Sequence, residues 1–173
     1  LRAEAVARAI EHLVRPEAPE VVRSFERTFA GVVGVRHAIA LSSGKAALAL
    51  ALRGLGVPAR AGVVVAAYNV PEVPSLLAGM GLNVRFADID PRGYAPRAAQ
   101  VERAVQVGDR VLLATHLYGT PVDLDGLSDL ARARDMLLIE DCAQALGATW
   151  RGRPVGQVGR AAIYSFGLMK SLN

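Results

Sequence analysis

Short apolar runs alternate with helix-like segments along most of this 173-residue chain, and this alternation constrains the fold more than any other feature. From residue 37 on, the apolar runs contain few polar positions, as expected for strands that are buried on both faces. They are HAIAL, GVVVAA, NVRFAD, DRVLLAT, DMLLIED and AAIYSF. Between them, helical periodicity covers residues 44–55, 71–79, 95–106 and 123–135. The pattern predicts an α/β fold with a mostly parallel sheet and helices on both faces.

The first 30 residues have a different texture and are predicted to be an N-terminal helical segment. Residues 2–14 have apolar positions at helical spacing, and Pro16 and Pro19 interrupt that pattern. Proline is tolerated in the first turn of a helix, so a second helix is expected from about Pro19 to about Phe29. The alternating α/β pattern follows this segment.

In an open α/β sheet, ligands bind at the carboxyl ends of the strands, so the residues that follow each apolar run are the candidate functional residues. They are Ser42, Ser43, Gly44 and Lys45 after the first run, Tyr68, Asn69, Val70 and Pro71 after the second, Asp88 and Asp90 after the third, His116, Tyr118 and Gly119 after the fourth, Glu140, Asp141 and Gln144 at the end of the fifth, and Ser165 and Lys170 after the last. The acidic residues Asp88, Asp90, Asp123 and Asp125 are interpreted as turn or cap residues.

The stretch SSGKAALAL at residues 42–50 is typical of a tight turn that opens a helix. Helix N-termini bind phosphate, because their backbone N–H groups lack intrahelical partners and the helix dipole is positive there. A nucleotide P-loop is excluded, since Ile39 stands where its first glycine is needed and Ala46 replaces the metal-binding hydroxyl. A strand–turn–helix corner without a ligand is the alternative.

Other familiar sites find no support in the sequence. Cys142 and the three histidines lack the spacing of metal ligands, so no metal site is predicted. No G-x-S-x-G nucleophile elbow is present. Gly152, Gly156 and Gly159 do not follow a strand in the manner of a dinucleotide fingerprint.

Composition limits the classes of binding partner and the cellular compartment that are expected for this chain. The formal net charge is +4, without a run of like charges, and aromatic residues make up only 5% of the chain. This favours a small anionic ligand over nucleic acid. A single cysteine fits a reducing compartment, and the apolar runs are too short for a bilayer, so a cytoplasmic protein without membrane contact is expected. Cys142 itself is interpreted as a core residue.

A lysine, an aspartate after a strand and a phosphate-binding turn together are the groups that pyridoxal phosphate (PLP) requires. The lysine forms a Schiff base, the aspartate pairs with the pyridine nitrogen, and the helix N-terminus holds the phosphate. Each group also has an ordinary explanation, since lysines are mostly solvated and an aspartate after a strand often caps the next helix.

Three ordered motifs resemble the DegT/StrS family of PLP-dependent sugar aminotransferases, which have the aspartate-aminotransferase type of fold. They are HLYGTPVD at residues 116–123, IEDCAQALGA at 139–148 and YSFGLMKSL at 164–172. The resemblance begins near Phe25, where the family's opening segment is also matched, and covers only the N-terminal portion of the family's length. It implies that residues 31–173 form part of the PLP-binding large domain, and that the chain by itself is inactive.

The resemblance also implies a role for each residue that matches a motif. Lys170 corresponds to the lysine that binds PLP and moves the proton, and Asp141 to the aspartate on the pyridine nitrogen. Gln144 corresponds to the glutamine near the cofactor ring and its phenolic oxygen. The phosphate is expected to bind at Ser165 and at the turn of Ser43, Gly44 and Lys45. His116 and Tyr118 are expected to line the same region, although His116 is equally well explained as a strand-end histidine with satisfied hydrogen bonds.

Two positions depart from the family pattern. Lys45 stands where the family has threonine, so a backbone contact to phosphate survives but a hydroxyl contact does not. Val70 stands where an aromatic residue usually stacks on the pyridine ring, and it covers the ring with less area and no π contact. These departures leave open a non-catalytic regulatory or binding homologue.

The resemblance implies an aminotransferase of polysaccharide biosynthesis that moves an amino group, expected from glutamate, onto a keto group of a nucleotide-linked sugar. The expected partners are therefore a nucleotide-sugar, an amino-acid donor and a second subunit of a homodimer. A PLP sugar dehydratase of the same family is the other alternative. Lys170 argues against it, because those enzymes have histidine at that position.

Overall fold

The computed structural model describes residues 19–167, which divide into two compact units, one up to Ala40 and one from Leu41 on. The first unit contains helix α2 (Pro19–Val33). The helix continues past the expected end at Phe29 and past Gly31. It ends at Val33, the following Gly34 has φ +79°, and the N–H groups of Gly34 and Val35 both donate to the carbonyl of Ala30 at 2.9 Å. The helix expected over residues 2–14 lies outside the described residues.

The strand predicted for residues 37–41 is wrong. These residues have no regular structure, and the side chain of Ile39 is 71% exposed. The N–H of Ala40 donates to the Glu26 carboxylate at 2.8 Å, which is a contact to a side chain of the first unit and not to a strand. A strand needs a neighbour to satisfy its backbone groups, and no strand in the described part of the chain pairs with this segment.

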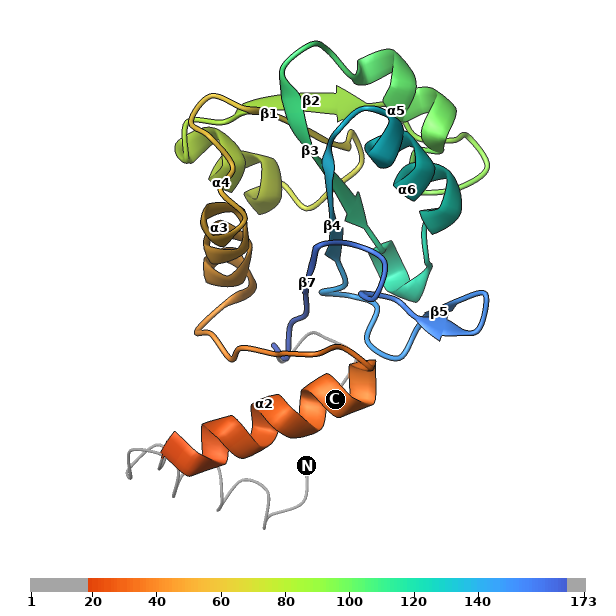
Figure 1. Cartoon of the computed structure of the whole chain (residues 1–173). Helices are drawn as coiled ribbons and strands as arrows, with labels where there is room; N and C mark the ends of the chain where they lie inside the picture. Colours follow the sequence, from red (N-terminus) through yellow and green to blue (C-terminus); the bar gives the residue numbers. More distant parts are fainter. Residues whose placement is uncertain (1–18, 168–173) are drawn as a thin grey trace. The chain divides into compact units, whose positions relative to one another are not determined.

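The second unit contains a parallel sheet of five strands in the order β2-β1-β3-β4-β7. The strands are β1 (Gly62–Ala66), β2 (Asn83–Ala87), β3 (Asp109–Thr115), β4 (Leu137–Asp141) and β7 (Ala161–Ile163). Figure 1 shows them with their connecting helices. The parallel sheet predicted from the apolar runs is therefore confirmed for these five runs.

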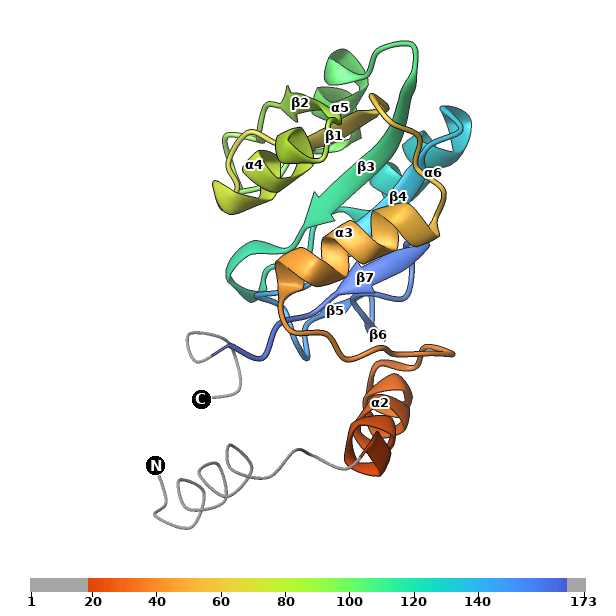
Figure 2. The same cartoon turned by 90° about the vertical axis from the view of Figure 1, so that its left-hand side faces the viewer.

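Helices cover both faces of this sheet, as predicted (Figure 2). Helices α3 (Gly44–Gly54) and α4 (Glu72–Gly79) pack on one face against Val63 and Val65. Helices α5 (Ala98–Ala104) and α6 (Leu124–Ala133) pack on the other face, where Val64 and Leu112 point. Successive side chains of β1 thus pack into the cores on opposite faces of the sheet, and this explains why that strand has no polar position.

Two elements differ from the expected pattern. Helix α5 is shorter than the predicted 95–106, and a small hairpin of β5 (Thr149–Trp150) and β6 (Arg153–Pro154) was not predicted. Its turn residues Arg151 and Gly152 both have positive φ, at 49° and 78°, as a tight hairpin turn requires. A 3₁₀ turn, η1 (Leu117–Gly119), follows β3. Within residues 19–167, no helix has the length and apolar character needed to span a membrane.

Candidate functional site

The carboxyl ends of three neighbouring strands are aligned at one edge of the sheet. Thr115 at the end of β3 is in register with Asp141 at the end of β4, and Asp141 is in register with Ile163 at the end of β7. The alignment continues one residue further, because the N–H of His116 donates to the carbonyl of Asp141 at 3.0 Å. The residues that follow these strands therefore meet at this edge, as the sequence predicted.

The N-terminus of α3 lies beside the end of β7. A Cβ built on Gly44 would be 3.8 Å from Cγ2 of Ile163, two residues before Ser165. Ser43 caps the helix, and its Oγ accepts from the N–H of Ala46 at 3.1 Å. The structure thus brings the turn of Ser43 and Gly44 close to the strand that leads to Ser165. The side chain of Lys45, in the first turn of the helix, is exposed.

Asp141 and Gln144 are held by backbone N–H groups near this edge. The Asp141 carboxylate is nearly buried, and its Oδ1 accepts from the N–H of Ala143 at 3.1 Å. Oε1 of Gln144 accepts from the N–H of Tyr118 at 3.2 Å. These contacts bring Asp141, Gln144 and Tyr118 together from the loops after β3 and β4, and they fix the orientation of the Gln144 amide.

The loop after β1 is fastened to the end of β3 by Asn69. Its Nδ2 donates to Oγ1 of Thr115 at 3.1 Å, and its Oδ1 accepts from the N–H of Val70 at 2.7 Å. Val70 is half-buried in this loop. Asn69 and Thr115 therefore position two residues, Tyr68 and Val70, on the same side of the sheet edge as Asp141. The sequence motifs did not assign this role to Asn69 or Thr115.

Glu140, which the sequence placed at a strand end without assigning it a role, is a buried ionisable group. Its carboxylate is fully buried and accepts from the N–H groups of Gly156, Val158 and Gly159 at 2.6, 2.8 and 2.7 Å, and from Nε2 of His116 at 3.2 Å. Burial by itself raises the pKa of this carboxyl, but these hydrogen bonds outweigh it and hold the pKa below its ordinary value. Two features of the sequence could have indicated this role: a glutamate inside an apolar run, and a Gly-x-x-Gly segment at residues 156–159.

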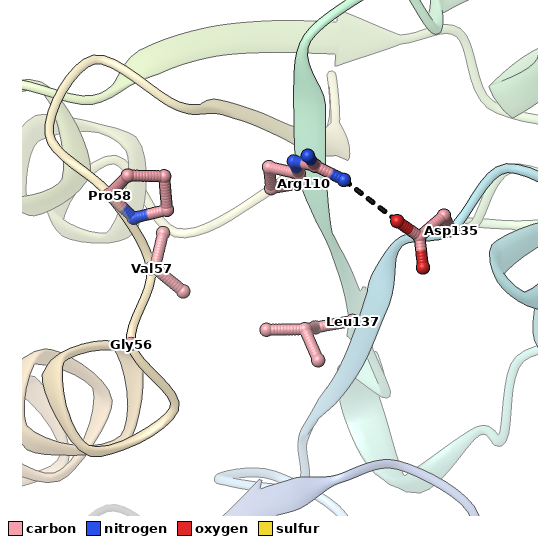
Figure 3. A pocket seen from close by; sticks show the side chains of 6 residues that line it. All are labelled: Gly56, Val57, Pro58, Arg110, Asp135 and Leu137. Carbon is pink, nitrogen blue, oxygen red and sulfur yellow. Dashed lines mark hydrogen bonds and ion pairs between the residues drawn. The ribbon is translucent and has the colours of Figure 1, made fainter.

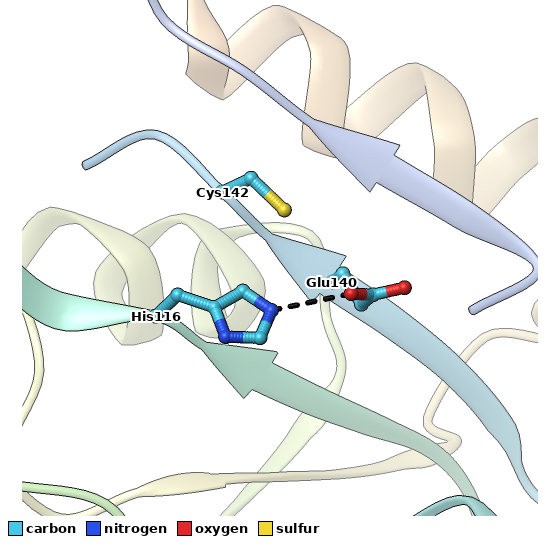
Figure 4. A group of neighbouring side chains, drawn as sticks. All are labelled: His116, Glu140 and Cys142. Atoms are coloured by element: carbon cyan, nitrogen blue, oxygen red, sulfur yellow. Dashed lines mark hydrogen bonds and ion pairs between the residues drawn. The ribbon is translucent and has the colours of Figure 1, made fainter. Parts of the chain in front are cut away.

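His116 is fully buried beside Glu140 (Figure 4). Its Nδ1 accepts from the N–H of Val122 at 3.1 Å, so the ring proton is on Nε2 and is donated to Glu140. Both ring nitrogens are thus satisfied within the described residues. His116 orients the strand end and is not open to a substrate, in agreement with the second of the two roles considered from the sequence.

The side chains of His116, Glu140 and Cys142 have ligand-type atoms within 4.8 Å of one another. Desolvation, followed by the charge of Glu140, raises the pKa of the Cys142 thiol, which therefore stays protonated. The oxygens of Glu140 and both nitrogens of His116 are already hydrogen-bonded. His116 and Glu140 are hydrogen-bonded to each other, and Cys142 belongs to the apolar core beside them, as predicted.

Of the four aspartates expected in turns or caps, Asp123 and Asp90 have those roles. Asp123 caps α6 by accepting from the N–H of Gly126 at 3.2 Å. Asp90 is buried in the turn after β2, where it accepts from the N–H of Arg92 at 2.9 Å. Asp125 lies in the first turn of α6 and pairs with an arginine of the β5–β6 hairpin, while Asp88 is exposed. Lys170, the predicted Schiff-base lysine, lies outside the described residues.

A pocket of about 330 Å³ lies at the opposite end of the sheet (Figure 3). It is lined by Gly56, Val57, Pro58, Arg110, Asp135 and Leu137. Arg110 and Asp135 form an ion pair at 2.8 Å on one side of it, opposite Val57 and Pro58. These residues precede or begin strands β1, β3 and β4, so the pocket is separate from the candidate site.

Comparison with known proteins identifies the family that the chain resembles over almost its whole length. Residues 3–173 match the DegT/DnrJ/EryC1/StrS aminotransferase family. The UDP-N-acetyl-3-dehydro-α-D-glucosamine 3-aminotransferase of Acidithiobacillus ferrooxidans is 36% identical over 150 residues, which are 87% of this chain and 41% of that protein. The L-glutamine:scyllo-inosose aminotransferase of Streptomyces griseus is 38% identical over 143 residues, which are 83% of this chain and 34% of that protein.

Two further similarities are informative. A pleiotropic regulatory protein of Geobacillus stearothermophilus is 33% identical over 153 residues, which are 88% of this chain and 41% of that protein. The solved structure of an aminotransferase from Psychrobacter cryohalolentis superposes with a TM-score of 0.89 at 31% identity, covering 97% of this chain and 43% of the other. The chain thus spans less than half the length of the proteins that it matches.

Proposed function

The chain belongs to the DegT/DnrJ/EryC1/StrS aminotransferase family, and from this premise we propose that it acts in PLP-dependent transfer of an amino group to the keto group of a sugar. The observation that carries the proposal is the meeting of Asp141, Gln144 and the N-terminus of α3 at one edge of a parallel sheet. The amino donor is proposed to be glutamate, and the acceptor a nucleotide-linked keto-sugar.

The residues at this edge fit PLP by their chemistry. The cofactor has an anionic phosphate, which suits the first turn of α3, where backbone N–H groups are available and Gly44 leaves its own backbone uncovered. It also has a basic ring nitrogen, which suits a nearly buried carboxylate such as that of Asp141. Ser165, two residues after Ile163, is proposed as a further phosphate ligand.

PLP, when bound, supplies an electron sink for bonds at the amino-bearing carbon of the donor. The remaining work is assigned to residues of this chain. Asp141, with Oδ1 anchored by the N–H of Ala143, is proposed to keep the proton on the ring nitrogen. Gln144, whose Oε1 accepts from the N–H of Tyr118, would have its Nε2 donor left for the phenolic oxygen of the cofactor. Lys170 is proposed to bind the cofactor and to carry the proton, and Val70 to cover one face of the ring.

The experiment uses the full-length natural gene product that contains these residues. Purification with PLP, reduction by borohydride and peptide mapping are expected to place a stable cofactor label on Lys170. Lys45 is the only other lysine among the 173 residues, so Lys45→Arg is the matched control and should retain the label. The proposal is wrong if Lys170→Arg is still labelled and still aminates the keto-sugar.

Amino transfer is assayed separately, with glutamate and glutamine as donors. The acceptors are UDP-N-acetyl-3-dehydro-α-D-glucosamine and scyllo-inosose, which the names of two relatives supply. Amination of either acceptor supports the proposed sugar aminotransferase activity. Amination of the UDP-linked acceptor alone would show that the enzyme requires a nucleotide on its substrate. We further propose that the full-length protein works as a cytoplasmic homodimer in polysaccharide biosynthesis, and that residues 31–173 are part of its PLP-binding large domain.

A regulatory homologue that binds the cofactor without transferring an amino group is the second candidate. The similarity to the Geobacillus stearothermophilus regulatory protein favours it, together with the departures at Lys45 and Val70. A borohydride label on Lys170 without amination of either acceptor would support this candidate over the first.

A further inference from the structure

Three tyrosine rings form a cluster at the carboxyl edge of the sheet, next to the candidate site. Tyr68, Tyr94 and Tyr118 come from the loops after β1, β2 and β3, which are neighbouring strands. The ring centroids of Tyr94 and Tyr118 are 5.5 Å apart, those of Tyr68 and Tyr94 are 5.8 Å apart, and those of Tyr68 and Tyr118 are 6.5 Å apart. We call these three residues the tyrosine cluster.

The three tyrosine rings are largely exposed, so burial in the core is not the reason for their positions. The residues are 43%, 56% and 62% exposed for Tyr68, Tyr94 and Tyr118. Tyr118 also has φ 54° and ψ 32°, a left-handed conformation that costs an ordinary residue free energy and that glycine adopts freely. Residues in such conformations cluster at functional sites. The left-handed conformation of Tyr118 beside Gln144 is consistent with a binding role for its ring.

The hydroxyl groups of the cluster leave a hydrogen-bond donor available. The hydroxyls of Tyr68 and Tyr118 are 2.8 Å apart, and this bond uses one of their two protons. Neither hydroxyl has another partner among residues 19–167. One phenolic proton and several oxygen lone pairs thus remain for a ligand that has hydroxyl groups.

The cluster is joined to the candidate cofactor site through its backbone. The N–H of Tyr118 donates to Oε1 of Gln144, and Asn69, which follows Tyr68, is bonded to Thr115 at the end of β3. A ligand on the rings would therefore lie beside Gln144 and the edge that holds Asp141.

We propose that the tyrosine cluster binds the polyhydroxylated six-membered ring of the keto acceptor. The faces of the aromatic rings cover the C–H groups of the acceptor, and the available phenolic proton is donated to one of its hydroxyls. This inference rests on the proposed function, because the acceptor is the substrate that a sugar aminotransferase brings to this edge.

The test compares two substitutions to glycine in the full-length, PLP-loaded protein. Tyr118→Gly removes one ring but keeps the left-handed backbone and the N–H that holds Gln144. Arg60→Gly is the control, since Arg60 has φ 62° and lies before β1, at the far end of the sheet. Both changes relieve similar backbone strain, so both variants are expected to keep the melting temperature of the parent.

Steady-state kinetics use whichever of UDP-N-acetyl-3-dehydro-α-D-glucosamine and scyllo-inosose the parent aminates. Tyr118→Gly is expected to raise KM for the acceptor about tenfold, with KM for the donor and the visible absorbance of the bound cofactor unchanged. Tyr118→Phe, which keeps the ring and loses the hydroxyl, should have a smaller effect. Arg60→Gly should leave both KM values unchanged.

Three outcomes would overturn the inference. An unchanged acceptor KM in Tyr118→Gly, with an active parent, shows that the ring does not bind the acceptor. An altered cofactor absorbance shows that Tyr118 acts through Gln144, and a loss of dimer by sedimentation shows that the cluster contacts a second copy. A parent that aminates neither acceptor refutes the proposed function itself, and the inference fails with it.

Discussion

Replacing Glu140 by glutamine tests the hydrogen-bonded core beneath the candidate site. Oε1 of Glu140 accepts from the N–H groups of Val158 and Gly159, and Oε2 accepts from Gly156 and His116. The glutamine amide has one oxygen and one NH₂ group. Whichever way it is turned, the NH₂ group faces two donors, so two of the four hydrogen bonds are lost.

The magnitude follows from this count. A hydrogen bond to a charged group contributes about 1.5–3 kcal/mol, so the loss of two costs about 3–6 kcal/mol, and the lower desolvation cost of the neutral amide offsets part of this. We therefore expect Glu140→Gln to lower the free energy of unfolding by about 3–5 kcal/mol, a large part of the stability of an ordinary domain. His116 cannot relieve the conflict by moving its proton, because its Nδ1 accepts from the N–H of Val122.

The assay is denaturant unfolding of the full-length protein, followed by fluorescence and circular dichroism. Glu102→Gln is the matched control, since Glu102 is on the surface and pairs with Arg134 in solvent. It should change the free energy of unfolding by less than about 1 kcal/mol. Equal losses in the two variants would refute the reasoning.

The pH dependence gives a second readout of the same group. The pKa of Glu140 is held below its ordinary value, so its stabilisation is present above the unfolded-state pKa and is lost as the pH falls through the folded-state pKa. The parent should therefore lose stability in acid more steeply than Glu140→Gln. A steeper acid dependence in the variant would contradict the assigned charge.

Three further results are expected. Gly156→Ala should cost more stability by thermal unfolding than Gly152→Ala, because both have positive φ but only at Gly156 would a Cβ collide, 2.1 Å from a tyrosine oxygen; equal losses would contradict this. Ser43→Ala should lower the free energy of unfolding by about 1 kcal/mol through loss of the α3 cap, and an unchanged unfolding midpoint would show that the cap is unimportant. Tyr118→Phe should lower the pKa of Tyr68 in ultraviolet titration, because the hydrogen bond between the two hydroxyls is the main cause that raises it; an unmoved pKa would exclude that bond in solution.

The regular elements of the second unit were predictable from local patterns. The run at 62–66 is apolar at every position because Val63 and Val65 serve one core and Val64 the other, and such a run identifies a central parallel strand without knowledge of its neighbours. The helix start at Ser43 and Gly44 was equally local, since a cap needs only a side-chain oxygen and the N–H groups that follow it. Because the strands are parallel, their ends had to meet at one edge, and this placed Gln144 after β4 near Tyr118 after β3.

Contacts between distant segments were not predictable from any local pattern. The run at 37–41 has the composition of a strand but no strand partner among the described residues, and a strand exists only when another strand satisfies its backbone. Glu140 stands within an apolar run, and the groups that make its burial tolerable come from a loop 16 residues or more away in sequence. The sequence shows that a glutamate is present but not which backbone N–H groups hydrogen-bond to it.

The sequence by itself determined the five parallel strands with their connecting helices, the sheet edge that carries the candidate site and the motifs that identify the family, because each depends on neighbours within a few residues. Only the tertiary structure decided that His116 is a buried hydrogen-bonding residue, that Asn69 fastens one loop to the end of β3, and that Tyr68, Tyr94 and Tyr118 meet. These outcomes depend on the register of β1, β2 and β3, which is set by packing across the whole sheet and leaves no periodic trace in the chain.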